Sequence, residues 1–269
     1  DTPTSSSRDY FSVILWDGYN RLASQSTGQD TSFSAGVEAG TYYVYVDDSS
    51  YYSAGEYGLT VTSTAGDLSG VETEDNGSMP TADVLSSGKE IKGQLSSSDD
   101  RDVFRITTTS AGTLKIDLDT PTSSSRDYFS VILWDGYNTI AAQSTGQDTS
   151  FSAGVAAGTY YVYVDSFTYH SDGEYGLKVT STEGGISGVE TEDNGSMPTA
   201  DVLSSGKEIK GQLSSSDDRD VFSITTTSAG ILKIDLDTPT NSAYNEYFNV
   251  ILWDGYNTIA AQSTGQDTS

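Results

Sequence analysis

The sequence predicts an all-β protein built from tandem antiparallel domains of the sandwich or barrel type, and three observations lead to this prediction. Gly, Ser, Thr and Asp are abundant, and these residues are poor helix formers. Short runs of strand-forming residues recur every 8–12 residues or so, with turn-forming clusters between them (spacings of roughly this size are typical of sandwiches). The chain also repeats itself at a domain-sized interval.

An internal repeat of 118 residues sets the organisation of the chain. The stretch Asp1–Asn20 returns letter for letter as Asp119–Asn138, and a diverged copy with one inserted residue starts at Asp237. Val71–Phe104 likewise recurs unchanged as Val189–Phe222. Such near-identity indicates recent duplication, and the period is far longer than that of a solenoid repeat.

Two stretches rich in Gly, Ser and acidic residues, 64–70 and 182–188, are interpreted as linkers. They divide the chain into the C-terminal half of a preceding repeat at 1–63, a complete repeat at 71–181 and the N-terminal part of a following repeat at 189–269. We therefore expect the chain to be a window of a longer tandem array.

Within the complete repeat, eight short runs alternate with turn clusters, and each is expected to be a strand. Leu114, Ile116 and Leu118 share one face by the period of two, whereas the residues between them are polar. The segment Met79–Leu85 has room for one helical turn, and no longer apolar stripe of helical period is present. The expected strands are Glu90–Leu95, Val103–Thr108, Thr113–Leu118, Phe129–Trp134, Thr139–Gln143, Thr149–Ala153, Thr159–Asp165 and Tyr175–Thr180.

The charge of the chain excludes several classes of partner. With 39 acidic and 13 basic residues the formal net charge is -26, which repels nucleic-acid phosphates and anionic membrane surfaces. No apolar run approaches the roughly 18 residues of a membrane span, and no signal peptide is visible. Because Cys is absent, disulfides and thiolate metal sites are excluded, and divalent cations remain the natural partners of this surface.

The sequence lacks the motifs of catalysis. His170 is the only histidine, and Tyr52 stands at the equivalent position one repeat earlier, so a Ser-His-Asp triad in every unit is excluded. Neither Gly-x-Ser-x-Gly nor His-Glu-x-x-His occurs. Carboxylate pairs of the glycosidase kind abound on so acidic a chain, but a duplicated sandwich without an evident cleft argues against that use. We therefore expect a protein that is not an enzyme.

The motifs of one unit, taken in order, resemble a known family. The unit begins with VETEDNG at Val71–Gly77 and continues with TADVLSSGKEIKGQLSSSDDRDVFRI, ILWDGYN and AGTYYVYVD before closing with EYGLKV. Over the whole unit this set resembles the bacterial pre-peptidase C-terminal domain family, which includes the collagen-binding domains of clostridial collagenases. The resemblance implies an eight-stranded jelly-roll sandwich that serves as a non-catalytic accessory module of secreted proteins. Some members bind calcium, and some bind collagen or polysaccharide.

Carboxylates gather at the start of each unit. Glu72, Glu74 and Asn76 alternate, so in an extended segment their side chains lie on one side. Asp99 and Asp102 come just before the strand expected from Val103 and would complete a set of hard oxygens of the kind that calcium prefers. The resemblance also implies calcium, because the matching positions supply its ligands in the collagen-binding relatives.

The same set returns one period later, and both copies depart from the relatives at one position. The relatives often carry Asp after the Asn, where Gly77 and Gly195 stand here, so one oxygen is missing. The alternative interpretation is that these acids are a solvated part of a very acidic surface. The residues of the second candidate calcium site are Glu190, Glu192, Asn194, Asp217 and Asp220.

Aromatic residues alternate with valines in the run TYYVYVD. If Val162 and Val164 face the core, the neighbouring tyrosines face outward, and Trp134 lies opposite the apolar face of its own strand. Outward aromatic rows suit sugar rings or collagen ridges, whereas the alternative is cross-strand packing that stabilises the sheet. The candidate ligand-binding residues are Tyr43, Tyr45, Trp134, Tyr161 and Tyr163.

Two functions are in competition, both extracellular and bacterial. In the first, neighbouring copies of the repeat form a calcium-stiffened stalk, adhesin arm or filament. In the second, the repeats form an accessory module that binds polysaccharide or a fibrous protein with avidity, as part of a secreted hydrolase. A third expectation, a secretion or processing appendage, is weaker. The number of repeats in the full gene distinguishes a stalk from an accessory module.

Overall fold

The computed structural model is all-β in the part of the chain that it describes. Two 3-10 helices of one turn each, η1 (Met79–Thr81) and η2 (Met197–Thr199), accompany the strands. The first lies in the segment Met79–Leu85, where one helical turn was expected. No described helix is long and apolar enough to cross a membrane. The described residues are 11–27, 30–48, 57–66, 68–96, 100–120, 129–166, 173–184, 186, 188–214, 218–237 and 248–264.

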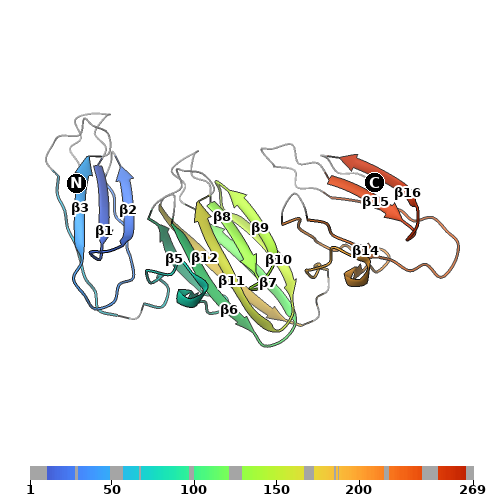
Figure 1. Cartoon of the computed structure of the whole chain (residues 1–269), viewed down its shortest axis with the longest axis horizontal. Coiled ribbons are helices and arrows are strands. Elements are labelled where there is room, and N and C mark those ends of the chain that lie inside the picture. The colour runs from blue at the N-terminus through green and yellow to red at the C-terminus, as the bar shows by residue number, and fades with distance from the viewer. Residues whose placement is uncertain are drawn as a thin grey trace. The chain divides into compact units, whose positions relative to one another are not determined.

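The complete repeat folds as a sandwich of two sheets (Figure 1). One sheet has the strand order β10-β7-β12-β5, and the other has the order β4-β6-β11-β8-β9. Apart from β4 and the β8–β9 hairpin, which stays within one sheet, the chain alternates between the sheets in the manner of a jelly roll, so this prediction is confirmed. The strands are β4 (Asp83–Val84), β5 (Glu90–Leu95), β6 (Arg101–Thr108), β7 (Gly112–Asp119), β8 (Phe129–Trp134), β9 (Thr139–Thr145), β10 (Thr149–Val155), β11 (Gly158–Ser166) and β12 (Gly173–Glu183).

All eight expected strands are present, and their ends differ from the prediction by a few residues at most. The short strand β4 was not expected, because it pairs in parallel with β6 through only two residues. At the other end, β12 continues two residues into the stretch 182–188 that was interpreted as a linker. Thr182 and Glu183 extend the antiparallel pairing with β7, which lengthens the strand.

The core of the sandwich follows from alternation within the strands. On β7, Leu114, Ile116 and Leu118 point inward and are buried, as the sequence pattern predicts. On β8, the inward residues are Phe129, Val131 and Leu133, which are completely buried. Each such side chain contributes about 1.5–3 kcal/mol on burial, so the two inner faces hold the sheets together.

The flanking repeats show parts of the same architecture. In the compact unit Asp1–Ile224, β1 (Phe11–Trp16), β2 (Arg21–Thr27) and β3 (Tyr43–Asp48) form a sheet ordered β2-β1-β3, and β13 (Asp201–Val202) pairs with β14 (Phe222–Ser223). These strands match β8, β9 and β11, and β4 and β6, of the complete repeat.

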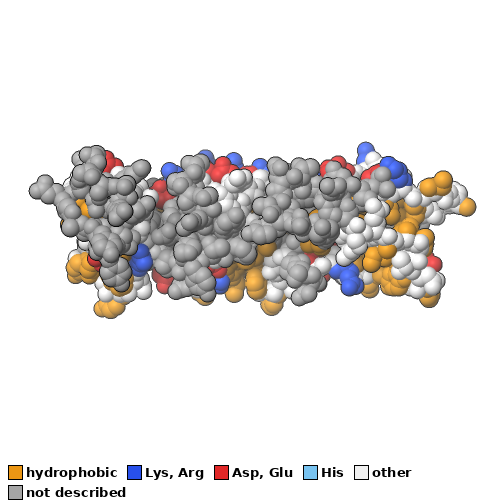
Figure 2. All heavy atoms as spheres, turned by 90° about the horizontal axis from the view of Figure 1, so that it is seen from above, with side chains coloured by type: hydrophobic (Ala, Val, Ile, Leu, Met, Phe, Trp, Pro, Cys, Tyr) orange, Lys and Arg blue, Asp and Glu red, His pale blue; other side chains and the backbone are white. Residues whose placement is uncertain are grey.

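The second compact unit, Thr225–Ser269, contains the hairpin of β15 (Phe248–Trp253) and β16 (Thr258–Thr264). Hydrophobic side chains lie at its surface (Figure 2). Leu232, for example, is 42% exposed, whereas its counterpart Leu114 in the complete repeat is fully buried. The counterparts of core residues are therefore less buried in the described residues of this unit than in the complete repeat.

Candidate metal centre

Three carboxylates from two distant segments meet at the start of the complete repeat. Glu72 lies in an extended segment that pairs with β5, where its N–H donates to the carbonyl oxygen of Lys92 at 2.9 Å. Glu74 follows two residues later, and Asp102 comes from β6. One carboxylate oxygen from each residue lies within 4.8 Å of the others. The period of two in the extended segment therefore places Glu72 and Glu74 together, as expected.

Asn76 completes this group on the same side of the segment. Its Nδ2 donates to Glu72 Oε2 at 3.5 Å and to Asp83 Oδ2 at 3.3 Å. Glu72 is only 3% exposed, and Asn76 and Asp102 are fully buried. The structure thus brings Glu72, Glu74, Asn76 and Asp102 into one buried cluster, which we call the first carboxylate cluster.

Three oxygens of the first carboxylate cluster are buried without a hydrogen-bond partner among the described residues. They are Glu74 Oε1, Asn76 Oδ1 and Asp102 Oδ1. A buried acceptor without a partner costs about 1–3 kcal/mol, and more when it is charged. Acceptors without donors are the ligand set of a hard cation, so the residues present fit a metal ion of the calcium or magnesium type.

Glycine at position 93 keeps room beside this cluster. A Cβ atom there would overlap the hydroxyl group of Tyr175 and would lie 2.6 Å from Glu72 Oε2. Glu72 Oε1 accepts a hydrogen bond from the main-chain N–H of Gln94, the next residue on β5. The backbone of β5 therefore approaches the Glu72 carboxylate closely, and only glycine permits that approach.

The cluster is electrostatically unfavourable without a cation. Burial, together with the nearby carboxylates, raises the pKa of Glu72 to about 8 and that of Glu74 to about 9. The pKa of Asp102 is raised well above its ordinary value for the same reasons. A bound divalent cation would favour the charged forms and remove the repulsion between them.

A second carboxylate cluster repeats this geometry one period later. Glu190, Glu192 and Asp220 each offer an oxygen within 4.8 Å of the others. Asn194 Nδ2 donates to Glu190 Oε2 at 3.4 Å, and Glu192 Oε1, Asn194 Oδ1 and Asp220 Oδ1 are again buried without a partner in the described part of the chain. Burial raises the pKa of Glu190 to about 8 and that of Glu192 to about 7. The identical sequence of the two segments therefore gives the same arrangement in both repeats.

Some residues of the site were expected and others were missed. Asp99 and Asp217 lie outside the described residues. Asp83, on β4, was missed: its Oδ2 accepts a hydrogen bond from Thr73 N at 2.7 Å, and Asp201 does the same for Thr191. The only sequence signal for Asp83 is its place in the TADV motif, since the β4–β6 pairing that positions it is not visible in the sequence.

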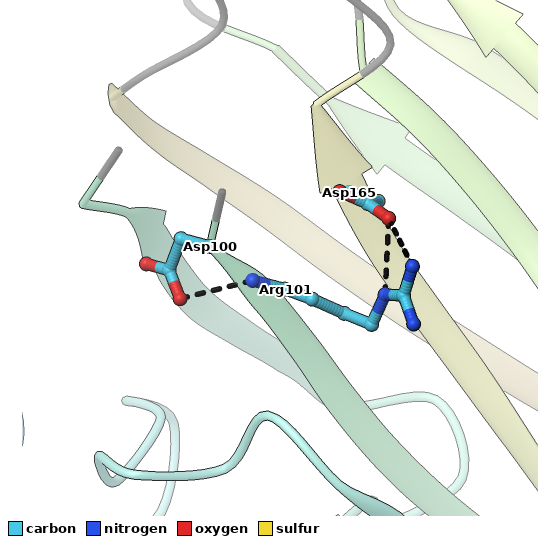
Figure 3. A network of polar contacts seen from close by, with 3 residues as sticks. All are labelled: Asp100, Arg101 and Asp165. Atoms are coloured by element: carbon cyan, nitrogen blue, oxygen red, sulfur yellow. Dashed lines mark hydrogen bonds and ion pairs between the residues drawn. The ribbon is translucent and has the colours of Figure 1, made fainter. Parts of the chain in front are cut away.

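Asp100, also missed, connects the end of β5 to the start of β6 beside the cluster. Its Oδ2 accepts from Ser96 N at 2.6 Å, and its Oδ1 accepts from Arg101 N at 2.9 Å. The Arg101 side chain points the other way, to Asp165 at the end of β11, which its Nη2 meets at 2.7 Å (Figure 3). Arg101 thus links β6 to β11 beside the carboxylates.

The aromatic residues lie on the outer face of the five-stranded sheet. Val162 and Val164 are fully buried, whereas Tyr161 and Tyr163 face the other way and are half-buried. Trp134 packs on Tyr163 with ring centroids 5.8 Å apart, and the Arg101 guanidinium lies 5.7 Å from the centre of the Tyr163 ring. The expected outward orientation is present, and so is packing between strands.

The preceding repeat shows the same aromatic arrangement with more exposure. Trp16 and Tyr45 approach to 6.4 Å between ring centroids, and Tyr43 and Tyr45 are each about half exposed, at 52% and 54%. The outer aromatic pair is therefore present in both repeats.

The chain is similar to a domain of known structure. No protein-family model matches it, and no curated protein does. Among solved structures it is similar to the pre-peptidase C-terminal domain of a collagenase from Bacillus anthracis, with 26% sequence identity and a TM-score of 0.32. The match covers 37% of this chain and 94% of that domain. This is a domain of the family that the sequence motifs resemble.

Proposed function

We propose that the chain is a non-catalytic, extracellular tandem-repeat module in which calcium stiffens a stalk, an adhesin arm or a filament. One observation carries this proposal: a carboxylate cluster stands at the start of a repeat and recurs, residue for residue, one period later, and in both copies it contains buried oxygens without a partner among the described residues. Isolated surface acids have no reason to be buried in this way.

The position of the cluster explains how an ion would stiffen the array. Glu72 and Glu74 lie directly after the turn that ends at Gly70, where the chain enters the repeat, and Asp102 belongs to the body of the sandwich. An ion held by all three would fasten the entering segment to the body. Binding to the ordered state alone stabilises it by RT ln(1 + [L]/Kd), about 2.7 kcal/mol when calcium is a hundredfold above Kd.

Calcium is the ion that fits the place in which such a protein would work. Extracellular modules bind calcium with Kd values of ~10⁻⁴–10⁻³ M, which the surroundings of a cell can supply. A chain without cysteine has no disulfide to stabilise a small domain there, and a bound metal ion would supply such stabilisation. The family that the motifs resemble is likewise one of secreted proteins.

The proposal is tested by thermal melting of the chain in calcium and in chelator. We expect calcium to raise the melting temperature, and Asp102→Asn to reduce that increase, because it removes a charge and one anionic ligand. Glu38→Gln removes the same charge from an exposed position and serves as the matched control. An equal melting temperature of the unmodified chain in calcium and in chelator would contradict the calcium proposal and leave these acids with a structural role alone.

A second candidate function is binding of a polysaccharide or a fibrous protein, and the aromatic row favours it. Trp134, Tyr163 and Arg101 pack together on an outer face, and Trp16 with Tyr45 repeats the aromatic pair. The test is co-sedimentation with insoluble polysaccharide and with collagen fibres. Trp134→Ala should weaken binding, and Tyr137→Ala, which removes an aromatic ring that is 89% exposed in a turn, is the control. Equal binding by the two variants would exclude the row as the ligand surface.

A further inference from the structure

We propose that successive repeats are joined by a built head-to-tail interface, in which the open sheet edges of one sandwich are capped by the next copy of the repeat. The partner of this surface is the following repeat itself. We call this interface between two successive repeats the joint. Its contacts need no ion, so the proposal goes beyond calcium binding. Both joints described below lie within the compact unit Asp1–Ile224.

The first contact of the joint fixes the edge strand β2 against the edge strand β5. Gln94 Nε2 donates to the carbonyl oxygen of Ser24 at 2.6 Å, and the Ser24 hydroxyl donates to the carbonyl oxygen of Ser96 at 2.6 Å. All three residues are buried, with at most 3% exposed. Buried polar groups that satisfy one another in this way specify a single register between two surfaces.

The second contact places the backbone of the preceding repeat against the segment that carries the carboxylates. Gly36 forms an isolated parallel bridge with Thr73. A Cβ atom at Gly36 would overlap the carbonyl oxygen of Glu72, so this approach requires glycine. Nearby, Ser34 N donates to Glu174 Oε1 at 3.0 Å. Backbone, glycine and side chain together make this a close-packed contact.

The same contacts recur one period later. Gln212 Nε2 donates to the carbonyl oxygen of Ala142 at 2.5 Å, and these residues match Gln94 and Ser24. Gly154 N donates to the carbonyl oxygen of Glu190 at 3.1 Å, and Gly154 bridges Thr191 as Gly36 bridges Thr73. A contact that repeats with the sequence period is heterologous, and such an interface propagates along an array when it does not close into a ring.

The joint also covers edge strands of the sandwich that would otherwise be exposed. Strands β5, β9 and β10 are edge strands of their sheets, and exposed edges invite pairing with foreign chains. At the joint, the counterpart of β9 receives the Gln94 side chain, and the counterpart of β10 receives the segment at Thr73. Gln94 has a second role, because its N–H donates to the Glu72 carboxylate. The joint and the first carboxylate cluster therefore meet at Gln94, through its side chain and its main-chain N–H respectively.

The experiment measures the distance between two equivalent turns of neighbouring repeats. Because the chain has no cysteine, Tyr19→Cys and Tyr137→Cys provide the only two thiols for spin labels, at positions that are each 89% exposed. In chelator we expect one narrow distance distribution by dipolar electron spin resonance. Gly36→Ala should at least double its width. Gly66→Ala, where a Cβ atom meets nothing within 4 Å, should leave it unchanged.

A second variant, which removes a hydrogen bond without creating a steric overlap, keeps the test decisive if Gly36→Ala lowers the yield of folded protein. Ser24→Ala gives the first joint the side chain found in the second joint and removes one hydrogen bond, so it should broaden the distribution less than Gly36→Ala. Melting of each labelled variant shows whether the sandwich itself is intact.

The outcomes for the joint and for calcium are separable. A wild-type distribution that is narrow in chelator, unchanged by calcium and broadened by Gly36→Ala supports the joint and counts against the calcium-stiffened stalk. A distribution that narrows only when calcium is added, and that Gly36→Ala does not alter, overturns the joint and leaves the calcium proposal standing. A wild-type distribution as broad as that of Gly36→Ala in both conditions overturns the joint as well.

Discussion

Tyr175 donates its hydroxyl hydrogen to Asp102 Oδ2 at 2.5 Å, and the two residues come from opposite sheets of the sandwich. The same hydroxyl lies 3.3 Å from Glu72 Oε2. The Tyr175 ring packs edge-on against Phe104 and Phe129, with centroids 6.4 and 6.0 Å away. A core residue therefore holds the carboxylates, so the order of the metal centre depends on the packing of the sandwich.

Removing this hydroxyl tests the link between the core and the site. In chelator, Tyr175→Phe should lower the free energy of unfolding by about 1–3 kcal/mol, because Asp102 and Glu72 lose a buried donor. In calcium the loss should be smaller, since the ion supplies a positive partner. The measurement is denaturant unfolding in both conditions.

Tyr160→Phe is the matched control for Tyr175→Phe. The Tyr160 hydroxyl donates to the neutral carbonyl oxygen of Ala156 at 3.0 Å, away from the carboxylates. Its removal should lower the free energy of unfolding by about 1 kcal/mol, equally in calcium and in chelator. If calcium changed the cost of both variants by the same amount, Tyr175 would have no particular connection with the site.

Filling the space beside Glu72 should weaken metal binding at one cluster only. Gly93→Ala places a methyl group against Tyr175 and the Glu72 carboxylate, so we expect calorimetric titration with calcium to lose the contribution of the first cluster and to keep that of the second. Gly211→Ala should do the converse at Glu190. Gly66→Ala should bind as the unmodified chain does, and an unaltered isotherm for both site variants would contradict the assignment.

The fold was predictable because its signals are local. Alternation in Leu114–Leu118 and turn clusters between the runs define strands without any knowledge of their neighbours. The grouping of Glu72, Glu74 and Asn76 was predictable for the same reason, since period two acts within one segment. Asp83 and Tyr175 were missed because their places depend on pairing and packing between strands distant in sequence.

The joint between repeats was not predictable from the stretch that precedes Val71. Its Gly- and Ser-rich composition predicts a linker, but composition carries no information about contacts made by neighbouring strands. Gln94 and Ser24 are unremarkable in the sequence, and only their burial and mutual hydrogen bond show that two repeats meet there.

Two neighbouring residues of β8 should differ sharply in their effect on stability. Leu133 is fully buried between the sheets, so Leu133→Ala should lower the free energy of unfolding by about 2–5 kcal/mol. Ile132 faces outward and is half-buried, so Ile132→Ala should cost less than half as much. Denaturant unfolding measures both. Equal losses would show that the outer aromatic face is packed as tightly as the core, contrary to the arrangement described here.

The raised pKa values predict how stability depends on pH. Without metal, Glu72 and Glu74 have pKa values of about 8 and about 9 in the folded chain, against an ordinary value of 4.5. Between these limits the folded chain binds more protons than the unfolded chain, so stability falls as pH rises. In chelator, the melting temperature should therefore decrease from pH 6 to pH 9, a range above the titration of ordinary carboxylates.

Calcium should reverse this dependence, because it binds the deprotonated carboxylates and its stabilising effect grows as protons leave. The increase in melting temperature caused by calcium should thus be larger at pH 9 than at pH 6. The Glu72→Gln, Glu74→Gln double variant should reduce the slope of the profile in chelator, since its amides do not titrate and the carboxylates of Glu190 and Glu192, whose pKa values are also raised, still do. Glu38→Gln should preserve the slope of the unmodified chain. A chelated profile of the unmodified chain that rises with pH over this range would show that these two carboxylates are already charged without a metal.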